Sequence, residues 1–222
     1  MPDQPSRAVQ DYLKAIHSLG GADNTVLPMD IAARLGVRSP SVTGMLKRLS
    51  EAGLIHYESG YGARLTPEGI AEARRVIRRH RLLELFLTQV LGLDWSEVDA
   101  EADALEHAIS PRLEQALAAH LGEPALDPHG HPIPTREGQL ADRPLQPLFE
   151  FAPGQRVVIR EAQDDNPDRL RRWQALGLTP GVTVAILSHQ PLDDIYELQV
   201  GERIVPLGKS GLTGLRGELA LN

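Results

Sequence analysis

The sequence of 222 residues contains no cysteine. Disulfide bonds, cysteine-ligated zinc, iron–sulfur clusters and thiol catalysis are therefore excluded. No apolar run approaches the roughly 18 residues of a membrane-spanning helix. The first residues, from Met1 to Gln4, lack the basic and apolar regions of a signal peptide. These absences predict a cytoplasmic protein that has no membrane partner.

Apolar residues make up 41% of the chain, which is enough to build hydrophobic cores, and 222 residues fit two or three domains. The formal net charge of −7 is unevenly distributed. Residues 94–222 carry 11 basic and 21 acidic side chains, whereas residues 38–81 carry 9 basic and 4 acidic ones. A basic block on an acidic protein is typical of a module that binds a polyanion. An ordinary solvated surface explains the charge equally well.

Apolar residues in the N-terminal part recur first at helical and then at alternating spacing. Ser39 is expected to cap the third helix, with Pro40 at its first helical position, and Gly53 is expected to end it. The pattern predicts three helices followed by two strands of a hairpin, over residues 8–19, 29–35, 39–52, 54–58 and 63–65.

This order of elements is that of a winged helix-turn-helix domain, whose third helix enters the major groove of DNA. Short polar side chains at the start of that helix could approach base edges, and basic side chains one turn later suit phosphate contacts. A small helical bundle with a polar face is the alternative. The predicted DNA-contacting residues are Arg38, Ser39, Pro40, Ser41, Thr43, Lys47, Arg48 and, on the hairpin, Arg64.

The sequence pattern predicts that the residues after the hairpin form a helical part followed by a β-rich part. Helices are expected over residues 66–90, 96–108 and 110–121, followed by an extended connector over 122–153 that holds seven of the 17 prolines. Short strands and one helix then predict a small β-barrel of roughly 70 residues. The strands are expected over 157–159, 182–187, 195–200 and 203–205, and the helix over 167–176.

Carboxylates and imidazoles gather on the predicted central helices. His80 and Glu84 are four positions apart among apolar residues, whereas Asp11 on the first helix is by spacing alone an ordinary surface residue. Such oxygen and nitrogen groups on one helical stripe indicate a divalent metal site, and a solvated acidic face is the open alternative. One stripe of the helix expected over 96–108 carries Asp99, Asp103, Glu106 and His107.

Other residues with possible chemistry are interpreted as structural. His129 and His131 could bind a metal, but they lie in the proline-rich connector and are expected at the surface, whereas Trp95 and Trp173 are expected to pack in cores. No histidine is followed by glutamate, so the zinc-protease motif is absent. We therefore predict that the protein is not an enzyme.

Seven segments of the chain are specific in combination, although each alone is a weak motif. They are Ala8–Ile16, Ser39–Thr43, Gly53–Leu54, Arg79–Glu84, Glu106–His107, Pro128–Pro134 and Gly177–Gly181. In this order they resemble the diphtheria toxin repressor family of metal-dependent transcription regulators. The resemblance covers nearly the whole chain. It is closest to the manganese-sensing branch, here with a C-terminal FeoA-type, SH3-like domain.

The resemblance implies an α+β multidomain fold. A winged helix-turn-helix DNA-binding domain would span residues 1–72, a helical metal-binding and dimerisation domain 73–142, and an SH3-like small β-barrel 143–222. The implied activity is metal-activated repression of metal-uptake genes. The implied partners are a second copy of the chain, forming a homodimer, and a palindromic operator in double-stranded DNA.

The resemblance also implies two metal sites. In some members of the family the SH3-like domain adds ligands to the ancillary site, and here that domain offers Asp165 or Asp168. The primary site maps to Asp11, Asp103, Glu106 and His107, and the ancillary site to His80, Glu84 and Asp99.

The expected metal is Mn²⁺, with Fe²⁺ as the alternative. Iron-sensing members of the family have sulfur ligands where Asp11 and Asp103 stand, and a histidine where Asp99 stands. Hard oxygen ligands suit Mn²⁺ better than softer, later metals. A second alternative is a metal-binding or protein-interaction module without DNA binding, in which the segment Pro132–Pro134 docks on the SH3-like domain of its own chain.

Overall fold

The computed structural model describes residues 5–163 and 166–220. It divides into two compact units, which are considered separately. The first unit holds the residues up to His80 together with Leu105–Ser110 and Pro134–Leu140. The second unit holds Arg81–Ala104, Pro111–Ile133 and the residues from Ala141 onward.

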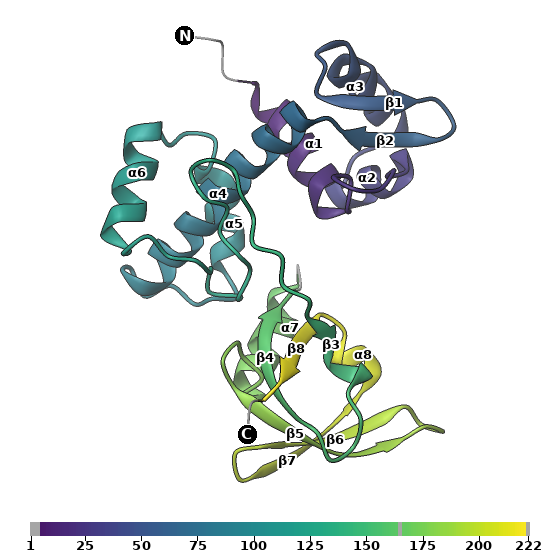
Figure 1. The fold of residues 1–222 in the computed structure, drawn as a ribbon, viewed down its shortest axis with the longest axis vertical. Coiled ribbons are helices and arrows are strands. Elements are labelled where there is room, and N and C mark those ends of the chain that lie inside the picture. The colour runs from purple at the N-terminus through teal and green to yellow at the C-terminus, as the bar shows by residue number, and fades with distance from the viewer. Residues whose placement is uncertain (1–4, 164–165, 221–222) are drawn as a thin grey trace. The chain divides into compact units, whose positions relative to one another are not determined.

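The first unit begins with the predicted winged helix-turn-helix order (Figure 1). The strands pair as an antiparallel hairpin in which Ile55 lies opposite Leu65. Leu13, Val42 and Leu46 are fully buried at the centre of this domain. Its elements are α1 (Arg7–Ser18), α2 (Pro28–Leu35), α3 (Ser39–Glu51), β1 (Ile55–Glu58) and β2 (Gly62–Leu65).

The two ends of α3 show one wrong prediction and one confirmed prediction. Ser39 is the first helical residue and not the cap, because Arg38 takes the N-cap position with extended backbone and no side-chain hydrogen bond. At the other end Gly53 has a φ of +73°. The amide of Leu54 donates to the carbonyl of Leu49 at 2.9 Å, which completes the left-handed end that glycine favours.

Three helices follow, α4 (Pro67–Gln89), α5 (Val98–Leu105) and α6 (Pro111–His120). The second is shorter than the helix expected over 96–108. At its start, Asp94 Oδ1 accepts hydrogen bonds from the amide and the hydroxyl of Ser96, which hold a turn in place of helix. At its end the chain turns after Leu105, so Glu106 and His107 lie just beyond α5 and not on its face.

The β-rich part of the second unit is one antiparallel sheet with the strand order β3-β8-β4-β5-β6-β7 (Figure 1). Trp173 is 1% exposed in its core, and Trp95 packs there too, which confirms both as packing residues. The expected connector also contains a short strand and a short helix. The elements are β3 (Gln146–Pro147), η1 (Leu148–Glu150), β4 (Arg156–Ala162), α7 (Pro167–Leu176), β5 (Thr183–Gln190), β6 (Ile195–Val200), β7 (Arg203–Gly208), α8 (Lys209–Leu212) and β8 (Leu215–Leu219).

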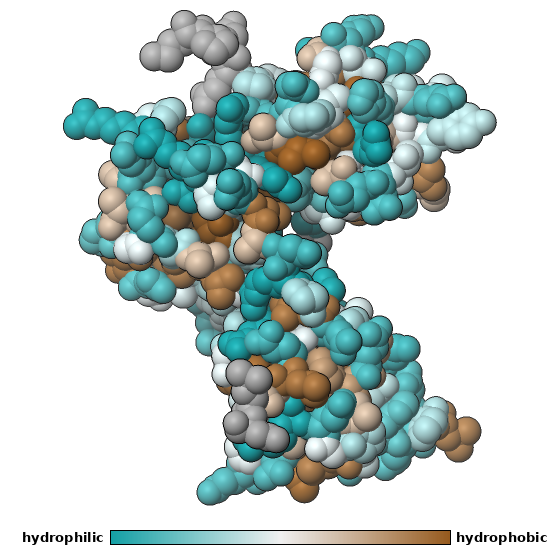
Figure 2. Space-filling view, in the orientation of Figure 1, coloured by the Kyte–Doolittle hydropathy of each residue, from teal (hydrophilic) through white to brown (hydrophobic). Residues whose placement is uncertain are grey.

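The connector is held by side chains of the helical part. Ile133 is 6% exposed and packs against Leu82, Leu85 and Ala118. Its side chain is thus already buried among helices, contrary to the idea that this segment docks on the SH3-like domain. Figure 2 shows a largely hydrophilic visible face with small, separate hydrophobic patches. None of the described helices combines the length and hydrophobicity that crossing a membrane requires.

Candidate metal centre and DNA interface

Three of the four predicted primary ligands converge in the first unit. Asp11 projects from α1 toward the turn that follows α5, where His107 Nε2 lies 2.8 Å from Asp11 Oδ1 and 3.4 Å from Glu106 Oε1. One ligand atom of each residue lies within 4.8 Å of the others. The side chain of Glu106 is 1% exposed and that of Asp11 is 35% exposed. The group is therefore a partly exposed cluster of two carboxylates and one imidazole.

Two hydrogen bonds through the buried side chain of Gln10 orient the imidazole of His107. This relay runs from Glu72 through Gln10 to His107. Nδ1 of His107 lies 2.7 Å from the amide oxygen of Gln10, which can only accept a hydrogen bond, so Nδ1 donates and Nε2 faces the carboxylates of Asp11 and Glu106. The amide nitrogen of Gln10 in turn donates to Glu72 Oε1 at 3.2 Å. Metal-ligating histidines have this arrangement, in which the second ring nitrogen donates to an oxygen that fixes the ring. The donor set and its orientation fit a hard divalent ion.

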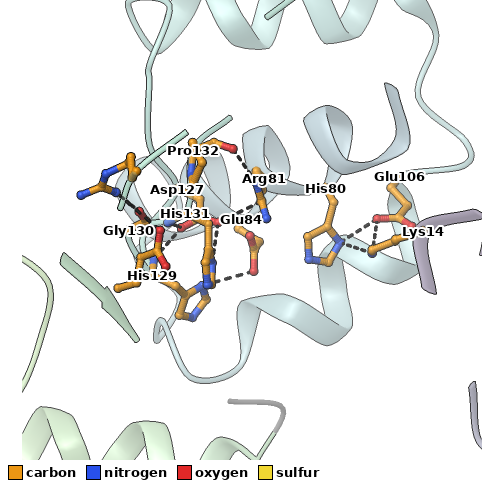
Figure 3. Close-up of polar contacts among 12 residues, drawn as sticks. Lys14, His80, Arg81, Glu84, Glu106, Asp127, His129, Gly130, His131 and Pro132 are labelled. Atoms are coloured by element: carbon orange, nitrogen blue, oxygen red, sulfur yellow. Dashed lines mark hydrogen bonds and ion pairs between the residues drawn. The ribbon is translucent and has the colours of Figure 1, made fainter. Parts of the chain in front are cut away.

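The second oxygen of Glu106 faces a different pair of groups (Figure 3). Glu106 Oε2 lies 2.6 Å from His80 Nδ1 and 2.8 Å from Lys14 Nζ. Lys14 Nζ is also 2.9 Å from His80 Nδ1. His80, predicted for the ancillary site, is therefore in direct contact with a residue of the primary site. Lys14 was missed from the sequence, although it lies three residues after Asp11 on the same face of α1.

Three other predicted ligands lie on the central helices. Asp99 and Asp103 are exposed residues of α5 in the second unit. Glu84 is buried on α4, one turn after His80. Asp165 lies outside the described residues. Asp168 is 84% exposed on the first turn of α7, where it pairs with Arg171 at 2.7 Å.

A second group, in the second unit, was missed by sequence reasoning. His129 is 5% exposed and stacks on Trp95 with ring centroids 5.2 Å apart, so its prediction as a surface histidine was wrong. Its Nε2 lies 2.8 Å from the carbonyl oxygen of Trp95, and its Nδ1 lies 3.3 Å from Glu84 Oε1 (Figure 3). The carbonyl fixes the ring so that Nδ1 faces the carboxylate.

Asp127 organises the connector around His129. Its Oδ1 accepts hydrogen bonds from the amides of His129 and His131 at 2.8 and 2.9 Å, and its Oδ2 lies 3.2 Å from His131 Nδ1. Arg81 Nε approaches the same carboxylate at 3.5 Å. Ligand atoms of Asp127, His129 and His131 lie within 4.8 Å of one another, which makes this a second group that could hold a metal ion.

The carboxylates of the second group stabilise the protonated form of His129. Burial by itself lowers the pKa of His129, but the hydrogen bond and charge of Glu84, the charge of Asp127 and the carbonyl of Trp95 raise the pKa of this imidazole overall. Carboxylates surround the ring closely enough to stabilise a cation at this position.

The predicted DNA face is polar and accessible. On α3 the buried side is Val42, Leu46 and Leu49, and the opposite side carries the exposed Lys47 and Arg48. Thr43 is half-buried. The remaining predicted contact residues are all exposed: Arg38, Ser39, Pro40 and Ser41 at the start of α3, and Arg64 on β2.

Comparisons with known proteins identify the family of this chain. Two models of iron-dependent repressor domains match the chain, the N-terminal DNA-binding domain over residues 6–63 and the metal-binding and dimerisation domain over residues 66–135, and a FeoA domain model matches residues 146–211. The iron-dependent repressor IdeR of Mycobacterium leprae is 33% identical over 187 residues, which cover 79% of this chain and 81% of IdeR. The chain belongs to the iron-dependent repressor family.

Two further comparisons extend this result. The diphtheria toxin repressor of Corynebacterium efficiens is 37% identical over 189 residues, covering 81% of this chain and 82% of that repressor. A solved structure of a manganese-dependent transcriptional repressor in complex with manganese is 31% identical, has a TM-score of 0.89, and covers 96% of this chain and all of the other. The winged helix-turn-helix, helical dimerisation and FeoA-type domains predicted from the sequence are confirmed, and this member of the iron-dependent repressor family is a metal-dependent DNA-binding repressor.

Proposed function

We propose that this repressor is activated by Mn²⁺ and that its loaded form represses metal-uptake genes, binding a palindromic operator as a homodimer. The observation that carries the proposal is the convergence of Asp11, Glu106 and His107. Two hard oxygen ligands and one imidazole suit Mn²⁺, and no thiolate is present to favour a softer ion. The relatives include proteins named for iron and for manganese, so Fe²⁺ is the competing activator.

The primary site in this proposal consists of Asp11, Asp103, Glu106 and His107. The hydrogen bonds from Gln10 to Glu72 and from His107 to Gln10 support it, because they hold Nε2 of His107 beside the two carboxylates, as the outer hydrogen bonds of metal-ligating histidines do. A bound divalent ion supplies the positive charge that these carboxylates need at close range.

The ancillary site has two competing ligand sets, which share Glu84. One is the set predicted by resemblance, His80, Glu84 and Asp99. The other joins Glu84 to His129 and Asp127, and is supported by the 3.3 Å approach of His129 Nδ1 to Glu84 Oε1. We propose the second set, because the carbonyl of Trp95 turns Nδ1 of the buried His129 toward Glu84, whereas Nδ1 of His80 faces Glu106.

The two sets make different predictions for metal content. Asp127→Asn preserves the shape of the side chain and should lower the Mn²⁺ bound per chain, whereas Asp99→Asn should leave it unchanged. Metal analysis after equilibrium dialysis measures both variants. Loss of metal from Asp99→Asn alone would support the set predicted by resemblance.

The ligands suggest how metal controls DNA binding. Asp11 belongs to the DNA-binding domain, whereas Glu106 and His107 belong to the matched metal-binding and dimerisation domain. Without metal the carboxylates of Asp11 and Glu106 repel each other, and the two domains are free to separate. With metal they are held together, which favours the arrangement in which two recognition helices of a homodimer match successive major grooves, roughly 34 Å apart. The metal thus shifts a population and makes no DNA contact itself.

Metal-dependent DNA binding under strictly anaerobic conditions tests the choice of metal. We expect half-maximal binding at a lower free concentration of Mn²⁺ than of Fe²⁺. Activation by Fe²⁺ at an equal or lower concentration would show that this repressor responds to iron. Glu106→Ala should abolish activation by either metal while the dimer persists, and Glu101→Ala, an exposed glutamate of α5, is the matched control.

The exact boundaries of the three domains are also part of the proposal. We retain the domains 1–72, 73–142 and 143–222, and treat Asp165 and Asp168 as doubtful ligands. A repressor acts where the chromosome is, which supports the cytoplasmic location expected from the sequence. Relatives named as repressors support a role outside catalysis.

A further inference from the structure

Lys14 places a positive charge inside the metal centre. Its side chain is 21% exposed and its ammonium group contacts both His80 Nδ1 and Glu106 Oε2, at 2.9 and 2.8 Å. All three residues belong to the first unit. Figure 3 shows Lys14 and His80 approaching the same oxygen of Glu106. The proposed ligand sets give this lysine no role.

The surroundings of Glu106 explain why a cation is needed there. The carboxylate is 1% exposed, and a buried carboxylate requires positive or hydrogen-bonding partners. Oε1 faces the side of Asp11 and His107, where the proposed metal ion binds. Oε2 faces His80 and Lys14 on the other side. A bridging carboxylate with an imidazole at its second oxygen would otherwise offer a position for a second divalent ion.

We propose that Lys14 is a built-in cation that limits this centre to one divalent ion. The ammonium group contacts both Glu106 Oε2 and His80 Nδ1, which are themselves 2.6 Å apart, and its charge repels a second metal ion from these two ligand atoms. In the metal-free protein the same ammonium group neutralises Glu106. This inference rests on the proposed metal function of Asp11, Glu106 and His107, and makes Lys14 the residue that determines metal stoichiometry.

The test compares variants that remove or keep the charge. Lys14→Met keeps a long side chain without the charge, and Lys14→Arg keeps the charge. Mn²⁺ bound per chain is measured by metal analysis after anaerobic equilibrium dialysis of the full chain at saturating Mn²⁺. We expect Lys14→Met to bind one ion more per chain than the wild type, and Lys14→Arg to bind the same number as the wild type.

Electron paramagnetic resonance locates the extra ion. Two Mn²⁺ ions that share the Glu106 carboxylate are spin-coupled, so the spectrum of Lys14→Met should lose the sharp hyperfine lines of isolated Mn²⁺. If Lys14→Met does not fold, Lys14→Gln is assessed by the same two measurements. An extra ion without spin coupling lies elsewhere in the protein and would overturn the inference.

The outcomes separate this inference from the proposed function. If the wild type binds Mn²⁺ and Lys14→Met binds the same number of ions, Lys14 does not limit the centre and the inference is wrong, while the proposed function stands. If Glu106→Ala binds as many Mn²⁺ ions as the wild type, the proposed metal centre is wrong and the inference is overturned with it.

Discussion

The two oxygens of Glu106 face different neighbours. Oε1 faces His107 at 3.4 Å, and Oε2 faces His80 and Lys14 at 2.6 and 2.8 Å. A carboxylate that is buried to this degree is stable only while its charge is balanced. A single side chain therefore joins the proposed metal position to the lysine that balances it, and its replacement alters both the loaded and the metal-free protein.

Gln10 should control metal affinity without touching the metal. Gln10→Leu fills a similar volume but removes the oxygen that fixes the Nδ1 proton of His107. Loss of such a partner lowers metal affinity by about 10–100-fold. We expect this loss in a Mn²⁺ titration followed by isothermal calorimetry. Asp30→Asn, at an exposed position of α2, should bind as the wild type does, and an unchanged affinity for Gln10→Leu would show that the relay has no part in binding.

The ligands proposed for the primary site could be predicted from the sequence, but the residues that contact them could not. Glu106 and His107 share a spacing with Asp103 that marks a site, and resemblance adds Asp11. Lys14 lies 92 positions from Glu106 along the chain, so only the fold shows their contact. His129 was misjudged because proline-rich connectors are normally solvated. Here its carbonyl accepts a hydrogen bond from the amide of Ala162 at 3.0 Å, which fixes the connector against β4.

Among the elements, α3 carries the predicted contact with DNA. Lys47→Ala should weaken binding to every DNA sequence alike and reduce the slope of log affinity against log salt by about one unit, because one phosphate contact is lost. Fluorescence anisotropy at several salt concentrations measures the slope. Lys209→Ala, on α8 in the FeoA-type domain, is the matched control and should leave the slope unchanged. Equal slopes for Lys47→Ala and the wild type would exclude a phosphate contact.

The end of α3 offers a pair of glycine variants with opposite expected effects. Gly53 has a φ of +73° and Gly44 lies within the helix, and a Cβ at either position would meet no atom within 4 Å. Gly53→Ala should destabilise the domain by roughly 1–2 kcal/mol through the backbone alone. Gly44→Ala should stabilise it by about 0.5–1 kcal/mol. Urea unfolding of the metal-free protein measures both, and shifts in the same direction would contradict the assigned end of α3.

Elements with strong periodicity were predictable, and short or non-local ones were not. The helix expected over 8–19 is observed as Arg7–Ser18, because five apolar residues at helical spacing define it. β8 was missed, since it is five residues long and depends on pairing with β4, where Val157 lies opposite Leu219. The boundaries of α5 were misplaced because the hydrogen bonds of Asp94 override helix propensity in the preceding turn.

For the whole molecule, Mn²⁺ should stabilise the folded state. A ligand that binds only the folded protein adds about 2.7 kcal/mol of stability at a concentration 100 times its dissociation constant. We expect the urea midpoint of the wild type to rise with Mn²⁺. Glu106→Ala should show a smaller rise, because it loses the primary site, and Glu101→Ala should show all of it. A full rise in Glu106→Ala would mean that the stabilising metal binds elsewhere.

The most direct test of the account is metal-dependent binding to an operator. The operator is recovered by selecting genomic DNA fragments on the Mn²⁺-loaded protein, and binding is followed by fluorescence anisotropy with Mn²⁺, with Fe²⁺ and with chelator at one salt concentration. We expect tight binding with Mn²⁺, weaker binding at equal free Fe²⁺, and none with chelator. Equally tight binding in the presence of chelator would contradict it, because the cluster of Asp11, Glu106 and His107 would then have no part in controlling the DNA-binding domain.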